Sequence, residues 1–547
     1  MKDLTQSRDL TSYAAPTEAT KPDRSDIEQF LSGQRTARAL TAQQLARLAP
    51  IGLLLFALLV RVVFVWQTGF DGLYGQDSFA YLDYAAAMKA ALAQGPAPPP
   101  FFWPIGYPAL VVILSAFAPL ATAAQFVNVA AGALAAVLTF LITRELLRGQ
   151  PGALIGSLFA GALVAVAGQM LISSVVAMSD ATALLAVTLS AFGMIRFHRT
   201  RTLAWLALAG FALGWAVTTR WVYALLIPVW GAAFVAGKWD ADERGRSRIY
   251  FFFPRSSAFI RVLILLAFFL LALSPQIALI AHHASRGVVS HIGNAEIIEW
   301  NLAHAWQSEL VNSDGRFSYA RPVGVFYTLP LVHPDYVPLW FTPLLALGLW
   351  ALRRLRFFLI MIGGWIGAVW IFLIGITWEN WRFPLAFFPP LAILGGIGLN
   401  AIVKHAPPLQ AKVIAGWLGL GLLVALAWGL GDAGKFVERH LSERATANWV
   451  SAQLPAGATV ITFGLTATLS HYSSLRVVEI SEESPDSVQT VARNGGEVFV
   501  LLNTENIESQ WPGRAPQINF HALRDRFGLR VVGTRAPYTL YSVGSAP

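Results

Sequence analysis

The dominant feature of this sequence is a series of long apolar runs that recurs through most of its 547 residues. A run of about 18 or more apolar residues can cross a hydrocarbon core of about 30 Å as a helix. Only 13% of the residues are charged, against roughly 25% in soluble domains. These runs predict a polytopic membrane protein. The candidate spans are residues 48–66, 124–143, 152–172, 179–197, 202–219, 221–237, 258–280, 336–352, 357–376, 384–403 and 411–430.

Basic residues in the short loops between the runs predict the topology, because cytoplasmic loops carry an excess of Lys and Arg. If the basic loops lie in the cytoplasm, successive spans can cross the membrane in alternating directions only if the short apolar piece 107–120 does not cross it. We therefore expect about eleven spans in a plasma or inner membrane, the N-terminus in the cytoplasm and the C-terminus outside. The basic loops contain Arg144 and Arg148, Arg196 to Arg201, Lys238 to Arg255, Arg353 to Arg356, and Lys404 to Lys412.

The composition also predicts three regions in a mainly α-helical chain. Residues 1–46 are polar and are expected to be a loosely ordered cytoplasmic tail. Residues 47–430 are expected to form the transmembrane helical bundle, with long outer loops at 67–123 and 281–335. Residues 431–547 have a different composition, in which strand-like segments alternate with helical ones, and this predicts a small extracytoplasmic α/β domain. Its predicted strands are residues 458–464, 475–480, 496–503 and 530–543.

Several classes of site and partner are excluded by composition. The chain has no cysteine, which rules out disulfides, thiolate metal sites and cysteine nucleophiles. Its net charge of +9 lies mostly in short loops rather than in a basic stripe, so we expect no nucleic-acid partner. The outer domain contains neither GxGxxG nor GxxxxGK[ST], so nothing indicates a nucleotide site there.

Ionisable residues at the predicted outer ends of spans are the first functional candidates. Asp77 lies in the first outer loop and Asp180 at the outer start of a span. Arg220 and Arg382 lie at outer ends, against the usual inside preference of arginine, and an arginine there can bind a lipid phosphate. The alternatives are that Asp77 caps a helix starting at Ser78, and that the arginines snorkel or form structural Arg–Asp pairs.

Three further side chains are weaker candidates for binding substrate or a metal. His282 and His283 follow a span at its outer end, but adjacent side chains on a helix point in different directions. Glu379 is an acidic residue close to Arg382. The tryptophans of the following outer loop, Trp300 and Trp306, are typical of interface anchors.

Short motifs follow one another in a fixed order along residues 48–430. They are Asp77-Ser78-x-x-Tyr81, Pro104-Ile-Gly-Tyr-Pro-Ala-Leu110, Thr143-Arg-Glu145, Met178-Ser-Asp-Ala181, a glycine-containing span ending in Thr219-Arg220, and Trp378-Glu-Asn-Trp-Arg-Phe-Pro384. Their order resembles that of the C-type (GT-C) glycosyltransferase superfamily, especially its protein mannosyltransferase-like and aminoarabinose transferase-like branch. Ser78 stands where many members have Glu, and Asp180 where Glu is commoner.

The resemblance implies a function and a role for each motif. It implies a hexosyl- or pentosyl-transferase that moves a sugar from a polyprenyl-phosphate donor to a lipid, glycan or protein acceptor at the extracytoplasmic face, with inversion. Asp77 would be the general base, assisted by Asp180, and Arg382 and Arg220 would bind the donor phosphate. Tyr81 belongs to the first motif and is a further substrate or metal candidate. Some members use a divalent cation such as Mg²⁺ or Mn²⁺, so a metal is possible here.

Two other classes of function remain open on the sequence. One is a lipid-linked oligosaccharide transporter or flippase without catalysis. Transporters tend to have inverted repeats and broken helices at the midplane, and neither is evident in this sequence. The other is a structural or sensory membrane protein whose outer domain binds a partner.

Overall fold

The structure is a computed structural model that describes residues 24–242, 254–286, 299–312, 314–494 and 497–544. The chain divides into two compact units, Met1–Ile51 and Gly52–Pro547. Of the first unit only helix α1 (Arg24–Thr68) is described, and this helix continues into the second unit. Residues 24–46 differ from the expected loosely ordered tail, because they are rich in Ala, Gln, Leu and Arg, which favour helix. Residues 1–23 of that tail lie outside the described residues.

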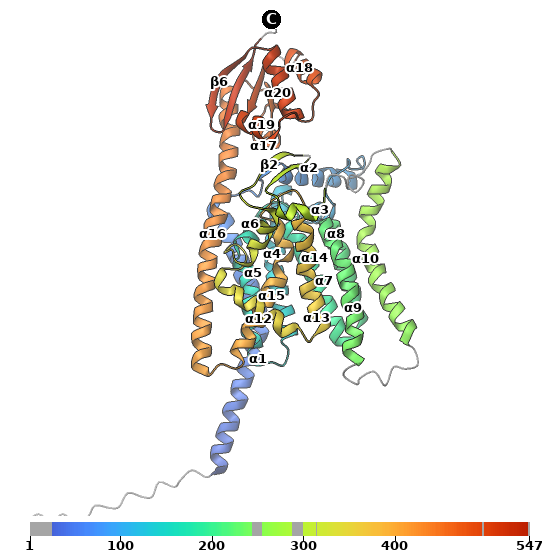
Figure 1. Ribbon diagram of the computed structural model, residues 1–547, viewed down its shortest axis with the longest axis vertical. Helices are drawn as coiled ribbons and strands as arrows, with labels where there is room; N and C mark the ends of the chain where they lie inside the picture. Colours follow the sequence, from blue (N-terminus) through green and yellow to red (C-terminus); the bar gives the residue numbers. More distant parts are fainter. Residues whose placement is uncertain (1–23, 243–253, 287–298, 313, 495–496, 545–547) are drawn as a thin grey trace, which may run out of the picture. The chain divides into compact units, whose positions relative to one another are not determined.

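The apolar runs of the sequence form helices that follow one another along the chain (Figure 1). They are α4 (Leu120–Leu146), α5 (Ala153–Val166), α6 (Gly168–Val175), α7 (Asp180–Thr200), α8 (Leu203–Thr219), η1 (Trp221–Leu225), α9 (Leu226–Asp242), α10 (Pro254–Ala284), η6 (Leu339–Phe341), α12 (Thr342–Leu352), α13 (Arg356–Leu359), η7 (Ile360–Gly364), α14 (Trp365–Ile374), η8 (Phe383–Phe387), α15 (Phe388–Val403) and α16 (Pro408–Gln453).

The helices of the described residues confirm a polytopic membrane protein. Seven are long and apolar enough to cross a bilayer, or eight if the bent pair α5–α6 counts as one span. Three shorter apolar helices, Leu203–Thr219, Trp221–Ala236 and Leu339–Leu352, coincide with three of the predicted spans. The total of eleven spans stays a prediction. The piece expected not to cross contains only the nine-residue helix α3 (Gly106–Leu114), which is too short to do so.

The core of the bundle is built from helices that are apolar on all sides. In the segment Phe383–Val403, formed by η8 and α15, 83% of the most apolar stretch is buried, against 11% in the Phe259–Ala284 part of α10. The η8–α15 segment therefore lies inside the protein, whereas α10 leaves most of its apolar side chains exposed. Small residues allow close helix contacts: a Cβ at Gly348 or Gly398 would collide with a backbone carbonyl across the α12–α15 interface.

One predicted span is broken in the middle. Helices α5 and α6 meet at Ala167, whose backbone is extended, and their axes differ by 56°. The carbonyl of Ala165 at the break accepts a hydrogen bond from Nη1 of Arg61, at 3.2 Å. Arg61 is fully buried on α1, so a cation of one span satisfies a carbonyl that the broken helix leaves free.

The two long loops that were expected on the outer side contain short elements of their own. The first loop forms α2 (Gly75–Leu92) and α3. The second forms η4 (Leu302–Trp306), a hairpin of β1 (Glu309–Asn312) and β2 (Gly315–Ser318), α11 (Val323–Thr328) and η5 (Leu329–Leu331). Residues 287–298 of this second loop lie outside the described residues. Both loops therefore provide ordered surfaces over the helical bundle.

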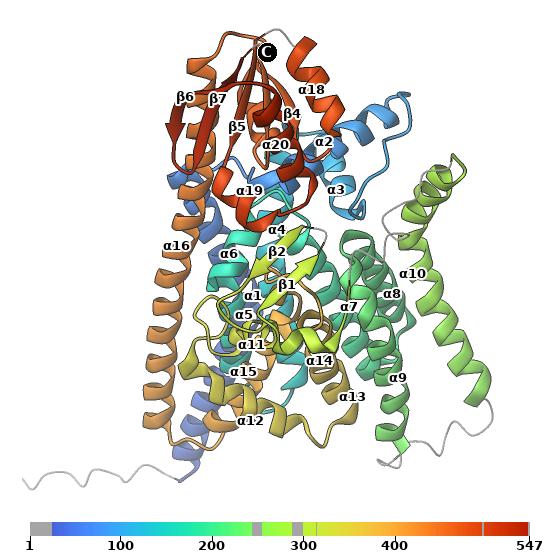
Figure 2. The same cartoon turned by 45° about the horizontal axis from the view of Figure 1, so that its top comes forward.

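The C-terminal region confirms a small α/β domain. Its five-stranded sheet has the order β4-β3-β5-β7-β6, parallel for the first three strands and antiparallel for the last two (Figure 2). The strands are β3 (Thr459–Thr462), β4 (Arg476–Glu479), β5 (Val498–Leu502), β6 (Leu529–Arg535) and β7 (Tyr538–Val543), and the helices are α17 (Thr466–Tyr472), α18 (Pro485–Asn494), α19 (Thr504–Gln510) and α20 (Ala515–Arg526).

The expected boundary at residue 431 falls inside a continuous helix. Helix α16 extends 23 residues beyond Leu430, to Gln453 (Figure 1). Ala433 and Val437 pack against α6, whereas Ala447 and Val450 belong to the core of the C-terminal domain. One helix thus contributes to both cores, and the apolar run alone marks only the membrane part of it.

Candidate active site

Asp77 lies in the first turn of α2, near the positive end of the helix. The helix begins at Gly75, whose φ of +60° suits glycine, and Tyr74 occupies the N-cap position. The interpretation of Asp77 as the N-cap is therefore wrong. Its Oδ2 instead accepts a hydrogen bond from Nη2 of Arg382 at 2.7 Å, across 305 positions of the sequence. The first motif and the last one thus meet in an ion pair.

Arg382 belongs to a turn that is fixed by surrounding side chains. Its backbone N–H donates to Oδ1 of Asn380 at 3.1 Å. The indole of the preceding Trp381 donates to Oδ2 of Asp335 at 2.8 Å. Asp335 is buried and also accepts from the indole of Trp428 on α16, at 3.0 Å. This carboxylate therefore fixes the backbone that carries Arg382.

The guanidinium of Arg382 has donors that lack a strong acceptor. Nη2 is bonded to Asp77, but Nη1 lies 2.7 Å from the thioether sulfur of Met178, a weak acceptor. The Nε is buried and has no hydrogen-bond partner among the described residues. An unpaired buried N–H is costly, so this guanidinium is prepared for an additional acceptor.

A second ion pair lies beside the first. Asp180 begins α7 and is paired with Arg220, which ends α8. The carbon at the centre of the Arg220 guanidinium is 5.6 Å from the ring centre of Phe383, and that of Arg382 is 5.7 Å from the same ring. The two arginines therefore contact one aromatic ring, and both carboxylates belong to one site.

Tyr81 connects α2 to the second ion pair. It lies one helical turn after Asp77, and its hydroxyl donates to Oγ of Ser179 at 2.9 Å. Burial raises the pKa of Tyr81 to about 12, so the hydroxyl stays protonated at neutral pH and can donate. Tyr81 thereby fixes the spacing between Asp77 and the residue that precedes Asp180.

The extended segment that leads into α7 is also anchored from α4. The amide of Asn128 donates to the carbonyls of Val176 and Met178, at 2.5 and 2.6 Å. Its Oδ1 accepts from Thr182 at 2.8 Å. An asparagine inside an apolar span is costly unless it is satisfied, and this one is fully buried and bonded at both ends.

The remaining candidates are not members of the two ion pairs. Glu379 is in the same turn as Arg382, but its described neighbours are Tyr319 and Arg321. Burial raises the pKa of Glu379 to about 7. His282 and His283 end α10 with their rings 5.4 Å apart.

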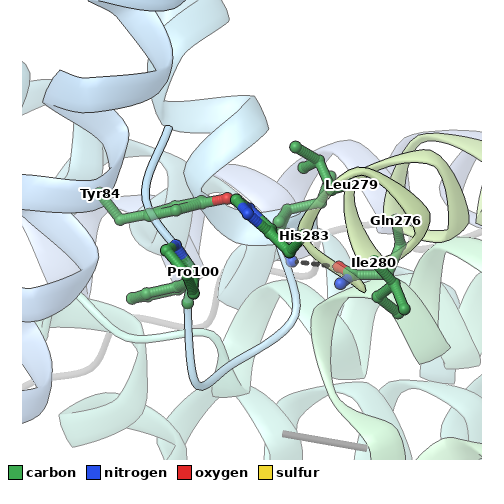
Figure 3. A pocket seen from close by; sticks show the side chains of 8 residues that line it. Tyr84, Pro100, Gln276, Leu279, Ile280 and His283 are labelled. Carbon is green, nitrogen blue, oxygen red and sulfur yellow. Dashed lines mark hydrogen bonds between the residues drawn. The ribbon is translucent and has the colours of Figure 1, made fainter. Parts of the chain in front are cut away.

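His283 lines a cavity of about 20 Å³ beside α2. Figure 3 shows its ring pointing toward Tyr84, with Gln276 about two turns earlier on α10. Gln276 accepts the backbone N–H of Ile105 at 2.9 Å. A cavity of this size accommodates a water molecule but no sugar, and its lining includes neither Arg220 nor Arg382.

No group of three or more His, Asp or Glu side chains is arranged to hold a metal ion within the described ranges of the chain. The divalent cation that the resemblance allows remains a prediction. Asp335 and Asn128 were not singled out from the sequence, because a lone Asp after a His-Pro pair and a single Asn in an apolar run belong to no recognised motif. Met178 was quoted only as the first residue of the motif that contains Asp180.

The chain is similar to known proteins in part of its sequence and in its fold. Residues 114–283 match the family model of dolichyl-phosphate-mannose-protein mannosyltransferase. No curated protein sequence matches the chain. Among solved structures, ArnT from Cupriavidus metallidurans is similar in its undecaprenyl phosphate-bound form (16% identity, 90% of this chain, 97% of that chain, TM-score 0.54). The apo form of the same protein is similar too (16% identity, 90% of this chain, 98% of that chain, TM-score 0.57).

The chain has the fold of a C-type glycosyltransferase. The archaeal oligosaccharyltransferase AglB from Archaeoglobus fulgidus, in complex with an inhibitory peptide and a dolichol-phosphate, is also similar (12% identity, 85% of this chain, 70% of that chain, TM-score 0.52). The resemblance inferred from the order of the motifs is confirmed. At these identities the solved structures establish the GT-C fold and not the substrates.

Proposed function

We propose that this protein is a membrane glycosyltransferase that moves a sugar from a polyprenyl-phosphate donor to an acceptor. The observation that carries the proposal is the convergence of Asp77, Asp180, Arg220 and Arg382 around Phe383. Paired charges from four separate segments are expensive to assemble at a membrane surface. A site that binds an anion and removes a proton needs both kinds of charge.

The phosphate of the donor would bind at Arg382 and Arg220. The free Nε and weakly paired Nη1 of Arg382 offer two charged N–H donors to phosphate oxygens. Binding there would weaken the hold of Arg382 on Asp77. ArnT and AglB were solved with polyprenyl-type phosphates, which supports a donor of the same class for this fold.

The reaction would be a single displacement. An acceptor oxygen attacks the anomeric carbon, the bond from that carbon to the phosphate oxygen breaks, and its electron pair leaves with polyprenyl phosphate. Asp77 takes the proton of the acceptor hydroxyl, and the two guanidiniums stabilise the charge on the leaving phosphate. Asp180 holds Arg220 in place or orients the acceptor. Attack opposite the leaving group inverts the anomeric centre.

The site is proposed to face the extracytoplasmic side. Asp180 begins the 21-residue helix α7, and Arg196 and Arg199 near its other end pair with Glu145 of α4. At about 1.5 Å per residue these ends are about 30 Å apart, the thickness of a hydrocarbon core. Because basic clusters mark the cytoplasmic side, the paired carboxylates would lie outside, with the N-terminus in the cytoplasm.

The test is product formation by purified protein in lipid nanodiscs, supplied with radiolabelled polyprenyl-phosphate sugars and membrane extract as the source of acceptor. We expect label to become covalently attached to the acceptor, and Asp180→Asn to reduce the rate at least about tenfold, since it leaves Arg220 unpaired. The matched control is Asp525→Asn, whose side chain is 69% exposed.

The transporter alternative is tested with the same reagents in sealed vesicles. Movement of intact lipid-linked sugar across the bilayer, without cleavage of the sugar–phosphate bond, would favour a flippase. Covalent transfer without such movement supports the glycosyltransferase.

A further inference from the structure

A second hollow lies between α2 and the C-terminal domain. It is a cleft of about 710 Å³, within the range of small-molecule sites. One wall is α2, and the other is formed by α17 and the residues that follow β3 and β4. The backbone N–H of Ala467 on α17 donates to Oε1 of Gln76 on α2 at 3.3 Å, which joins the two walls at one edge.

Helix α2 presents two different faces to the two sites. Gln76, Phe79, Ala80 and Asp83 line the cleft, and their spacing of three and four residues places them on one face. Asp77 lies next to Gln76 and therefore about 100° around the helix. A ligand in the cleft would thus occupy the adjacent side of the helix whose first turn carries the proposed base.

The position of the cleft in the C-terminal domain is also typical of a binding site. In sheets with parallel strands, ligands bind beyond the carboxyl ends of the strands. Phe463 and Gly464 follow β3, and Ser481 and Glu482 follow β4, so both strand ends open into the cleft.

The side chains that line the cleft define the chemistry of its occupant. Its carboxylates are Asp83, Glu479 and Glu482, and no Lys or Arg is among the described residues of its lining. Glu479 is occupied, since it accepts hydrogen bonds from Thr466 at 2.6 Å and from Ser481 at 3.0 Å. For Asp83 and Glu482 the described part of the chain shows no side-chain hydrogen bond.

Aromatic and hydroxyl groups complete this lining. Phe463 and Phe79 provide apolar rings, and Ser470 and Ser481 provide hydroxyls. Sugar hydroxyls are good donors to carboxylates, and sugar C–H faces pack on rings. His471 is the one basic side chain among the described residues of the lining, against three carboxylates. A phosphate or uronic acid would therefore meet more like charge than opposite charge.

We propose that this cleft binds a hydroxyl-rich saccharide, neutral or carrying an amine, as part of the glycosyl acceptor. The identity of this saccharide as acceptor rests on the proposed function. Asp83 and Glu482 accept hydrogen bonds from its hydroxyl or ammonium groups, and Phe463 contacts its ring. The acceptor hydroxyl reaches Asp77 around the edge of α2 at Gln76.

The binding test uses full-length protein in nanodiscs and three tetrasaccharides, measured by calorimetry and saturation-transfer NMR. The probes are the β-1,4 tetramers of glucosamine and of N-acetylglucosamine, and an anionic galacturonic acid tetramer. We expect the first two to bind and the third not to bind. Asp83→Asn and Glu482→Gln each weaken binding at least about fivefold. The matched control is Glu309→Gln, whose carboxylate is 67% exposed on β1 and outside the cleft.

Three outcomes separate this inference from the proposed function. Failure of both non-anionic tetramers to bind, or equal binding by wild type and the two cleft variants, overturns the saccharide site. Asp77→Asn should bind the tetramers as wild type does, since it leaves the cleft intact. If wild type transfers sugar but the cleft variants show an unchanged KM for acceptor, the acceptor assignment is wrong and the glycosyltransferase proposal stands.

Discussion

Replacing Arg382 by lysine separates charge from geometry in the candidate active site. Three nitrogens of the guanidinium have different environments: Nη2 is bonded to Asp77, Nη1 lies against Met178, and Nε has no partner among the described residues. A lysine keeps the positive charge but has a single nitrogen. Its three N–H donors all radiate from that one atom. When the ammonium is paired with Asp77, it cannot also occupy the positions of Nε and Nη1, from which the guanidinium would meet a phosphate.

The expected loss follows from those two donors. A hydrogen bond to a charged group contributes about 1.5–3 kcal/mol, so two of them at the low end contribute about 3 kcal/mol. At about 1.4 kcal/mol for each factor of ten, this equals roughly a 100-fold loss. Arg382→Lys should therefore reduce kcat/KM for the donor about 100-fold. Its thermal midpoint should change little, because the ion pair with Asp77 can persist.

The assay is radiolabel transfer by purified protein at several donor concentrations. The matched control is Arg316→Lys, which alters an exposed arginine that also pairs with a carboxylate, Glu309, and which should keep wild-type kcat/KM. A kcat/KM for Arg382→Lys within threefold of wild type would refute the view that the guanidinium binds the donor phosphate.

Three further predictions address the frame around the site. Asp335→Asn should lower both the thermal midpoint and kcat/KM, because an amide has only one acceptor oxygen for the two indoles of Trp381 and Trp428. The lost hydrogen bond costs about 1–3 kcal/mol. A thermal midpoint and a kcat/KM equal to those of wild type would contradict this role. The pKa of Glu379 in the folded protein, about 7, exceeds the ordinary 4.5, so the folded state becomes less stable as pH rises from about 4.5 to 7. Between pH 5 and 8 the free energy of unfolding of wild type should fall by about 1 kcal/mol more than that of Glu379→Gln, after allowance for solvent screening. Melting curves that shift equally with pH in both proteins would contradict this. Gly398→Ala should destabilise the protein by about 1–3 kcal/mol, since its Cβ collides with a carbonyl of α12, and an unchanged melting temperature would exclude that contact.

The helical bundle could be predicted from the sequence because each span is a local property. The run 179–197, for example, became α7 (Asp180–Thr200). Span ends are less certain where polar helix formers continue an apolar run. Glu438, Glu443 and Ala447 continue α16 well beyond the apolar run 411–430, so hydropathy marks only the apolar part of this helix.

The candidate site was only partly accessible to sequence reasoning. Asp77, Asp180, Arg220 and Arg382 were singled out because ionisable residues at outer span ends are unusual. Their pairing depends on how α2, α7, α8 and η8 pack, and spacing along the chain does not encode it. The bend between α5 and α6 was not predicted either, because the partner of the carbonyl at the break, Arg61, comes from a helix that is distant in the sequence.

The most direct test of the account is a single-turnover measurement on Asp77→Asn, with the donor saturating and its occupancy measured separately by retention of the radiolabelled lipid. The substitution keeps the shape of the side chain and leaves Arg382 free to bind phosphate. We predict donor binding similar to wild type and a transfer rate reduced at least about 100-fold, as for loss of a general base. A transfer rate equal to that of wild type, at full donor occupancy, would contradict the assignment of Asp77 as the base.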